Sequence, residues 1–289
     1  MSTSPPLAPL TSNTVRATTI HPTAIVDPSA HIAEGVSIGA YAMVGPHCTL
    51  AEGVTLHPHA VLLSHVSVGA HTEVYPHAVL GGPPQDYKFK GETSWVTLGQ
   101  HNIIREHVTI SRATGEGQHT TLGDHNMLMA YAHIGHNSHV ASHCILANNV
   151  QIAGHCHIEE YATLGGTTVY HQGIRMGAYS MLGGMSASRQ DIPPFAMVDG
   201  RPCMIYGLNS VGLKRNQFTL ADRQALKQAF RVLFFSRLPL PEAVAQTQEQ
   251  WGDSAPVQRL LAFVTHQPSR GICSAAFDKS ANTRTGEET

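Results

Sequence analysis

The sequence has few charged and few aromatic side chains, which make up 13% and 6% of its 289 residues. Its net charge of −2 gives no electrostatic reason to expect a nucleic acid or an anionic membrane as partner. No apolar run approaches the ~20 residues that a membrane-spanning helix needs. The first 18 residues also lack the basic and apolar regions of a secretory signal peptide. We therefore expect a soluble, cytoplasmic protein without stable membrane insertion and without a nucleic-acid partner.

Cysteine is scarce as well, and no two cysteines form a CxxC motif. The odd number of five is typical of reduced thiols in a cytosolic protein; they are Cys48, Cys144, Cys156, Cys203 and Cys273. Glycine and histidine are abundant, with 26 and 20 residues. This composition favours many short strands joined by tight turns.

The strongest pattern is an aliphatic residue at every sixth position. It runs without a break from Ile20 to Leu80 and, after two interruptions, continues to Leu182. A period of six fits neither a 3.6-residue helix nor long alternating strands. Three hexads of this kind would close one triangular coil, and stacked coils would lie at the strand spacing of ~4.8 Å. The pattern therefore predicts a parallel β-helix over residues 19–207, although periodicity does not give its handedness.

Two segments break the register, at residues 81–97 and 111–121. Insertions of this kind project from a solenoid as loops and often carry its function. We expect a C-terminal α-helical domain at residues 208–272, and disordered tails at residues 1–18 and 273–289.

The helical region contains start signals for three helices. Thr219 and Asp222 have the spacing of a capping box, and Pro241 can start a second helix. A third helix is predicted in SAPVQRLLAFV. Together they would cover the open end of the solenoid, whose strand edges would otherwise be unpaired.

Most of the histidines have a structural explanation in the repeat. Counted from each aliphatic residue as position one, ten of them fall at position four, where a turn can require a left-handed backbone conformation. They are His47, His59, His65, His71, His77, His101, His107, His125, His143 and His155. We expect His133, His139 and His157, at position six, to lie near a corner too.

His136 alone falls at position three, where we expect a side chain to point out from a flat face. His155 lies one coil and one residue further on, so the two rings should be close neighbours. The pair could serve proton transfer, or the spacing could be a coincidence. A zinc site would need three ligands within ~2.1 Å of one ion, and no two histidines have the five-residue spacing of zinc enzymes built on this repeat. We expect no metal.

A set of motifs resembles one family beyond the repeat itself. After QDYKFKGE follow AHIGHNS, CILANNVQIAGH, VYHQG, the Gly183–Gly184 pair, QDIPPF and NSVGLKR, and this order is similar to that of the bacterial UDP-N-acetylglucosamine O-acyltransferases. The resemblance covers about residues 19–272. It implies a left-handed β-helix and a homotrimer whose active sites lie between subunits, with no cofactor. It also implies transfer of an (R)-3-hydroxyacyl group from acyl carrier protein to the 3-hydroxyl of UDP-N-acetylglucosamine, the first step of lipid A synthesis.

The resemblance implies roles for single residues. His136 matches a general base, and the Gly154 amide matches a donor to the developing oxyanion. Gly184 matches a position that limits acyl length, and its lack of a side chain implies a longer acyl chain. Contacts to the nucleotide-sugar or the pantetheine arm match Gln85, Asp86, Lys88, His133, His155, His171, Gln172, Asn209 and Arg215. The ordinary alternatives are a solvated loop for Lys88, a corner histidine for His155 and a helix-start cation for Arg215.

Three positions depart from the family pattern. Asn137 stands in place of an acidic residue after the base, Val211 in place of an acidic ribose contact, and Asn216 in place of a second arginine. The amide oxygen of Asn137 can orient an imidazole but cannot stabilise imidazolium as a carboxylate would.

Other interpretations stay open at this stage. Arg223, Lys227 and Arg231 recur every four residues and would form either a docking face for the acidic acyl carrier protein or an ordinary solvated face. The acceptor could be a 3-amino UDP-sugar, which would give an amide. The chain could also be a non-catalytic structural solenoid, although such a stack has no use for Lys88 and His136.

Overall fold

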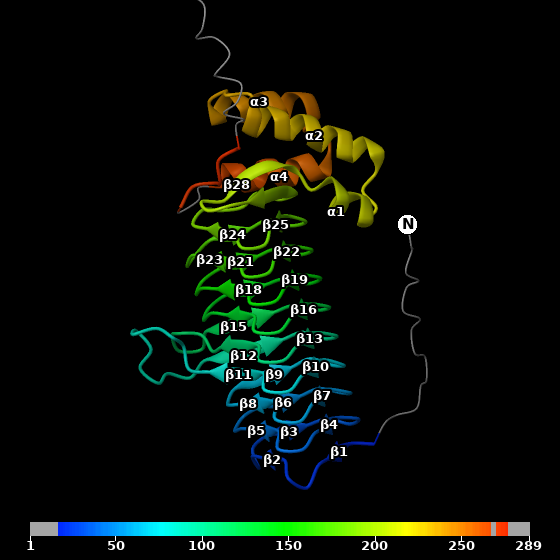
Figure 1. Cartoon of the computed structure of the whole chain (residues 1–289), viewed down its shortest axis with the longest axis vertical. Coiled ribbons are helices and arrows are strands. Elements are labelled where there is room, and N and C mark those ends of the chain that lie inside the picture. Colours follow the sequence, from blue (N-terminus) through cyan, green and yellow to red (C-terminus); the bar gives the residue numbers. More distant parts are fainter. Residues whose placement is uncertain (1–16, 267–269, 277–289) are drawn as a thin grey trace, which may run out of the picture.

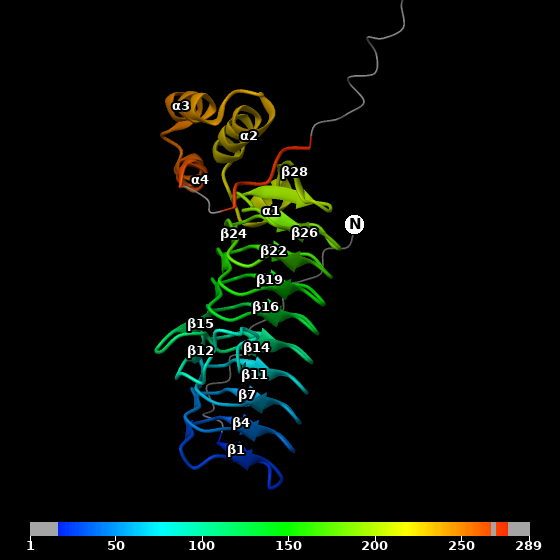
Figure 2. The same ribbon diagram turned by 90° about the vertical axis from the view of Figure 1, so that its left-hand side faces the viewer.

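The computed structural model describes residues 17–266 and 270–276. Most of the two expected tails, residues 1–16 and 277–289, lies outside the described residues. The described chain forms a tall parallel β-helix with three faces, followed by a small group of helices (Figures 1 and 2).

Each face of the solenoid is one sheet, and the three are named sheet A, sheet B and sheet C. Their strands pair in parallel, apart from the last strand of sheet A. Sheet A contains β1 (Thr19–Ile20), β4 (Ser37–Ile38), β7 (Thr55–Leu56), β10 (Glu73–Val74), β13 (Ile103–Ile104), β16 (Met127–Leu128), β19 (Ile145–Leu146), β22 (Thr163–Leu164), β25 (Met181–Leu182), β27 (Ala196–Asp199) and β28 (Met204–Leu208). Sheet B contains β2 (Ile25–Val26), β5 (Met43–Val44), β8 (Val61–Leu62), β11 (Val79–Gly82), β14 (Thr109–Ser111), β17 (His133–Ile134), β20 (Gln151–Ile152), β23 (Val169–Tyr170) and β26 (Ala187–Ser188). Sheet C contains β3 (His31–Ile32), β6 (Thr49–Leu50), β9 (Val66–Val68), β12 (Trp95–Leu98), β15 (His119–Leu122), β18 (His139–Val140), β21 (His157–Ile158) and β24 (Arg175–Met176).

The predicted triangular coil is confirmed by the register of these strands. In uninterrupted coils each strand pairs with the strand eighteen residues further on, as Ile38 pairs with Leu56. The aliphatic residue at position one points inward and is buried, as Leu50 and Ile134 are, while the residue before it faces outward. The core is therefore a narrow column of single aliphatic layers, which explains why the sequence needs only one large apolar residue per hexad.

The corners between the faces confirm the prediction for the ten position-four histidines. All ten have a positive φ, between +54° and +63°. In consecutive coils their rings lie above one another. At the corner between sheets C and A, one stack runs through His71, His101, His125, His143, Tyr161, Tyr179 and Phe195, with ring centroids 4.6 to 5.9 Å apart. These parallel rings stabilise the corner by stacking, so the histidines in them have structural roles.

Two expectations about histidine positions are wrong. His133, His139 and His157 are the first residues of strands, so they lie on the flat faces and not near corners. Position three, in contrast, is the first of the two turn residues, which places His136 at a corner. The reason is that each two-residue strand consists of position six and the following position one. Position two then leads into the turn, which occupies positions three and four.

The two predicted loops project from the same side of the solenoid (Figure 1). Because the flanking strands extend into both segments, the loops are shorter than expected and span residues 83–94 and 112–118. Two hydrogen bonds join the loops, since Thr93 N–H donates to the Glu116 carboxylate at 3.0 Å and Gly115 N–H donates to the Glu92 carboxylate at 2.7 Å.

The C-terminal part contains α1 (Ser210–Arg215), α2 (Leu220–Phe235), α3 (Leu240–Trp251) and α4 (Ala255–Thr265). The predicted cap of α2 is confirmed, since Thr219 Oγ1 accepts from Asp222 N–H at 3.0 Å and donates to the Asp222 carboxylate at 2.7 Å. The end of sheet A is closed by β28, which pairs antiparallel with β27 and contacts α2. In the described residues, no helix is long and apolar enough to cross a membrane.

The segment after α4 corrects the expected start of the C-terminal tail. Cys273 N–H donates to the Asp191 carbonyl at 2.9 Å, and Ile205 N–H donates to the Ser274 carbonyl at 2.8 Å. Cys273 and Ala275 are buried. Residues 271–276 therefore belong to the packed end of the solenoid.

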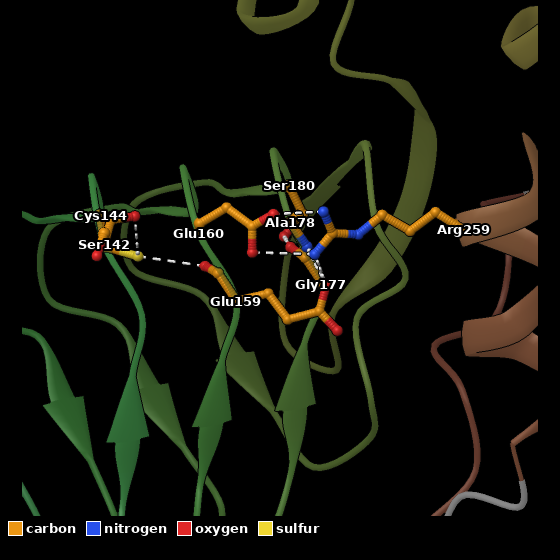
Figure 3. Close-up of polar contacts among 8 residues, drawn as sticks. All are labelled: Ser142, Cys144, Glu159, Glu160, Gly177, Ala178, Ser180 and Arg259. Atoms are coloured by element: carbon orange, nitrogen blue, oxygen red, sulfur yellow. Dashed lines mark hydrogen bonds and ion pairs between the residues drawn. The ribbon is translucent and has the colours of Figure 1, made fainter. Parts of the chain in front are cut away.

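A charged cluster ties α4 to the last coils (Figure 3). The Arg259 guanidinium donates to Glu159 at 2.7 Å and to both carboxylate oxygens of Glu160, one of them at 3.0 Å. Nearby, Arg175 pairs with the buried Asp191 at 2.7 Å and lies over the Phe263 ring, 4.3 Å from its centroid. Both arginines thus connect the helical part to the side of the solenoid, while α2 and α3 lie beyond β28 (Figure 2).

Candidate active site

A pocket of ≈ 320 Å³ opens beside the two loops, at the corner where sheet B turns into sheet C. Its lining comes from the first loop, from strands of sheet B and from the turns that follow those strands. The lining residues are Gln85, Ser111, His133, Gly135, His136, Gln151, Ile152, Ala153, Gly154, Val169, Tyr170 and Gln172. This is the region that the interruptions of the repeat predicted to be functional.

His136 lies in the turn after β17 and is only 7% exposed. Its Nδ1 is 2.9 Å from the side-chain oxygen of Asn137. The ring of His155, one coil further on, meets it edge-on with centroids 5.1 Å apart, which confirms the predicted contact between the two rings. One imidazole edge is thus held by the protein, and Nε2 is left on the side of Gly154.

Gly154 is required by the position of this ring. A Cβ at residue 154 would lie 2.4 Å from Nε2 of His136, far inside van der Waals contact. In the described structure no backbone or side-chain group accepts a hydrogen bond from Gly154 N–H. Pro46 and Pro58 occupy the same position of the hexad, so the coils do not need an N–H there. The Gly154 amide is therefore available to a ligand next to Nε2.

The first loop contributes a carboxylate and a cation. Asp86 accepts from Lys88 N–H at 3.0 Å and from the Thr114 hydroxyl at 3.3 Å. These two bonds lower the pKa of Asp86, and the positive charge of Lys88, together with that of His136 when its ring is protonated, adds to the effect. Asp86 is therefore ionised at neutral pH, and the Lys88 side chain is exposed beside it.

Two further histidines are kept neutral near pH 7. Burial lowers the pKa of His133, and the neighbouring His136 lowers it further. Burial also lowers the pKa of His155, again with His136 as the second cause. His133 Nδ1 lies 2.7 Å from the Thr109 hydroxyl. Neutral imidazoles around His136 can donate or accept hydrogen bonds without adding charge to the pocket.

Two of the remaining predicted residues lie at the same corner as His136, and three lie elsewhere. Gln172 lines the pocket, and His171 is exposed, with Nδ1 3.2 Å from the Gln172 carbonyl. Gly184 follows β25, at the corner between sheets A and B. Asn209 caps α1 and donates to the Tyr179 carbonyl at 2.9 Å, at the corner between sheets C and A, and Arg215 is exposed at the end of α1. A single chain does not bring these last three residues to the pocket.

The structure also shows residues that sequence reasoning missed. Thr114 contacts both Asp86 and Asn137, and Ser111 and Gln151 line the pocket. Thr114 belongs to the second loop, where no periodicity marks a residue, so only its place in an interruption could have drawn attention to it. Gln151 occupies the outward strand position that His133 holds one coil earlier, which was a usable signal.

The arrangement can support general-base chemistry. An imidazole nitrogen and a backbone N–H lie side by side, with a cation and a carboxylate at the rim. Among the described residues, no cluster of histidine, cysteine, aspartate or glutamate could hold a metal ion. The geometry suits removal of a proton from a hydroxyl group that attacks a carbonyl carbon.

Comparison with known proteins places these features in one family. Residues 191–273 match the domain described as "Udp N-acetylglucosamine O-acyltransferase; Domain 2", and residues 17–52 and 119–154 match bacterial transferase hexapeptide repeats. A curated acyl-(acyl-carrier-protein)–UDP-N-acetylglucosamine O-acyltransferase of Stenotrophomonas maltophilia is 39% identical over 86% of this chain and 95% of its own length. The enzyme of the same name from Xanthomonas campestris is 43% identical over 85% of this chain and 94% of its own.

Solved structures agree with these relatives. The UDP-N-acetylglucosamine acyltransferase of Bacteroides fragilis superposes with a TM-score of 0.86 at 30% identity, over 88% of this chain and 99% of that one. The UDP-N-acetylglucosamine O-acyltransferase of Moraxella catarrhalis gives a TM-score of 0.83 at 35% identity, over 88% of this chain and 98% of that one. The fold is therefore a left-handed parallel β-helix with a C-terminal α-helical domain, as the motifs implied.

Proposed function

The chain belongs to the acyl-(acyl-carrier-protein)–UDP-N-acetylglucosamine O-acyltransferase family, and on this basis we propose that it acylates UDP-N-acetylglucosamine with His136 as general base. The acyl group is an (R)-3-hydroxyacyl chain delivered by acyl carrier protein, and the acceptor is the sugar 3-hydroxyl. This is the first step of lipid A synthesis. One observation carries the assignment of roles: Nε2 of His136 lies against Gly154, whose N–H has no hydrogen-bond acceptor among residues 17–266 and 270–276.

The reaction follows from that juxtaposition. The sugar 3-hydroxyl gives its proton to Nε2 as its oxygen forms a bond to the thioester carbonyl carbon. The carbonyl oxygen becomes an oxyanion, and the Gly154 N–H donates a hydrogen bond to it. When the tetrahedral intermediate collapses, the carbon–sulfur bond breaks and the imidazolium returns the proton to the pantetheine sulfur. No cysteine takes part, in keeping with the burial of all five thiols.

Residues at the rim would hold the nucleotide-sugar. Lys88 supplies a positive charge for the substrate, and Asp86 and Gln85 supply acceptors and donors for sugar hydroxyls. His133, His155 and Gln172 surround the base and can contact the sugar or the pantetheine arm; His171 lies next to Gln172.

We infer a homotrimer from the distribution of these residues over the corners. Gly184, Asn209 and Arg215 would complete the pocket of a neighbouring copy, because no corner of one chain carries all parts. The outward residues of sheets A and B are often apolar and exposed, as Ile103 (39%), Ile145 (39%) and Val169 (47%) are. The outward residues of sheet C, in contrast, include Thr49, Ser67, Thr97 and Thr121. Apolar faces of this kind suit contact with other copies.

The donor would dock on α2. Lys227 and Arg231 are exposed on this helix, whereas Nε of Arg223 is buried and has no hydrogen-bond partner in the part of the chain that the structure describes. Acyl carrier proteins are acidic, so two exposed cations on one helix face would attract them. We propose that the protein acts in the cytoplasm, where the sequence led us to expect it.

The function is tested by mixing the purified protein with UDP-N-acetylglucosamine and a set of 3-hydroxyacyl carrier proteins. Mass spectrometry would identify an acylated nucleotide-sugar and report its acyl length. His136→Ala should reduce the rate by ~10²–10⁴-fold, the usual contribution of general-base catalysis. A product that forms only with a 3-amino UDP-sugar would replace the ester by an amide. Failure with both acceptors would leave a structural solenoid.

A further inference from the structure

We propose that Thr114 and Asn137 form one positioning unit, which fixes the tautomer of His136 and couples it to the loop that carries Asp86 and Lys88. This inference rests on the proposed role of His136 as the base. It concerns how the base is held when the neighbouring residue is an amide and not a carboxylate.

The first step is the orientation of the Asn137 amide. Its Oδ1 accepts from Thr114 N–H at 2.8 Å, and its Nδ2 donates to the Thr114 carbonyl at 3.0 Å. A backbone N–H can face only the oxygen of an amide, and a backbone carbonyl only its nitrogen. The pair of bonds to one residue therefore excludes the flipped amide, in which both contacts would be repulsive.

The second step concerns the ring. Because the orientation of the amide is fixed, the atom that lies 2.9 Å from Nδ1 of His136 is an acceptor. Nδ1 must then carry the proton in the neutral imidazole, and the lone pair lies on Nε2. This is the nitrogen beside Gly154. The Asn137 amide thus selects the one tautomer that can accept a proton in the pocket.

The third step links the ring to the loop. The Thr114 hydroxyl donates to Oδ2 of Asp86 at 3.3 Å, and Oδ1 of Asp86 accepts from Lys88 N–H at 3.0 Å. The backbone of Asn137 is held as well, since its N–H donates to Thr120 Oγ1 at 2.9 Å. Thr114 therefore touches both the group that orients the base and the carboxylate that positions Lys88.

An amide in this place makes a chemical difference. It orients the imidazole but adds no negative charge, so residue 137 does not form an ion pair with the imidazolium, and Asp86 is the carboxylate whose charge acts on the ring. A carboxylate at residue 137 would raise the pKa of His136, since an opposite charge within ~4–6 Å shifts a pKa by ~1–3 units. It would also place an oxygen against the Thr114 carbonyl, where Nδ2 now donates.

Three variants of the full-length protein test the unit. Asn137→Gly keeps the left-handed backbone (φ +58°) and removes the amide that positions the ring, so it should fold and lose ~10²-fold in kcat with little change in KM. Asn137→Asp should move the acidic limb of the kcat/KM profile to higher pH by ~1 unit or more. Thr114→Val keeps both backbone bonds but loses the hydroxyl, so KM for UDP-N-acetylglucosamine should rise about five-fold, the value of one ordinary hydrogen bond. Thr114→Ser is the control that retains the hydroxyl.

The tautomer itself is observed by ¹⁵N NMR of histidine-labelled protein, with His136→Ala identifying the signal. Wild type and Thr114→Val should show a protonated Nδ1, and Asn137→Gly should show a mixture. If Asn137→Gly and Asn137→Asp keep the wild-type kcat and pH profile while His136→Ala is inactive, the positioning role of Asn137 is refuted. The role of His136 as general base is then retained. If His136→Ala is fully active, the proposed function of this residue fails first.

Discussion

Replacing Gly154 by alanine should separate catalysis from stability. The residue has no positive φ, so alanine is compatible with the backbone. The new Cβ would lie 2.4 Å from Nε2 of His136, whereas ordinary contact begins near 3.4 Å, so the ring must move by about 1 Å. A displacement of that size at a catalytic group costs ~10²-fold in rate. We therefore expect kcat to fall about one hundred-fold, with KM for both substrates nearly unchanged.

The stability of the same variant should change little. The atom that must give way is the end of a side chain beside a pocket, and an off-rotamer ring costs ~0.5–1.5 kcal/mol. In a chain of this size that corresponds to a fall in Tm of ~2–4 °C. Gly135→Ala in the preceding coil is the matched control, because its Cβ would meet the backbone of Ala153 and Gly154 at 2.7 Å. Two coils would have to separate there, so Gly135→Ala should lower Tm by considerably more.

Steady-state kinetics with UDP-N-acetylglucosamine and the preferred acyl carrier protein, together with thermal melting of both variants, measure these effects. A Gly154→Ala enzyme with wild-type kcat would show that the ring of His136 does not act from its described position. Equal losses of Tm in the two variants would refute the distinction between a mobile ring and a rigid backbone.

Three other perturbations test the described contacts. Stability should fall as the pH drops from 7.5 to 5.5, because burial lowers the pKa of His65, His101 and His139 below the ordinary 6.5, so that the unfolded chain binds protons that the folded chain does not. Denaturant titration at both pH values measures the change in the free energy of unfolding. His101→Asn should reduce this pH dependence, and asparagine fits the turn, as Asn149 shows at the same position of another coil. A free energy of unfolding that is equal at both pH values would contradict the reasoning. Arg259→Met should cost ~1–2 kcal/mol at pH 7, a modest value because the arginine is 37% exposed. Arg259 lowers the pKa of Glu160, so the loss should shrink as the pH falls below the ordinary 4.5, and an unchanged Tm at pH 7 would argue against the clamp. Gly184→Met should shift donor preference to a shorter hydroxyacyl chain at unchanged Tm, since a Cβ at residue 184 would meet the Gly166 carbonyl oxygen at 3.4 Å and the Gly166 nitrogen at 3.9 Å, both at ordinary contact distance. An unaltered donor preference would contradict the role of Gly184 in limiting acyl length.

The repeat could be predicted in detail because each hexad reports its own geometry. A single aliphatic residue marks the inward direction, and a histidine, tyrosine or asparagine three residues later marks the left-handed corner. The same signal did not show on which side of the aliphatic residue the chain turns. For this reason His136 was expected on a face and His133 near a corner, when the opposite holds.

The candidate site could be predicted only in part. His136 and Gly154 were accessible through motif and spacing, since both lie in uninterrupted coils. Thr114, however, reaches Asn137 across 23 residues and an aperiodic loop, so no pattern in the sequence connects them. The ion pair between Arg259 and Glu160 joins residues 99 positions apart, one in a helix and one in the β-helix, so the sequence pattern could not predict it either.

The contact between the two loops helps to determine which coils of the β-helix become neighbours. The coils before Leu80 are nearly interchangeable, because each offers the next one the same inward aliphatic residue and the same turn. A slip by one whole coil would therefore leave most local pairings satisfied. The bonds from Thr93 to Glu116 and from Gly115 to Glu92 form only when two particular coils are neighbours. The loops therefore fix the register of the two coils that carry them, because a shift between these two coils would break both bonds.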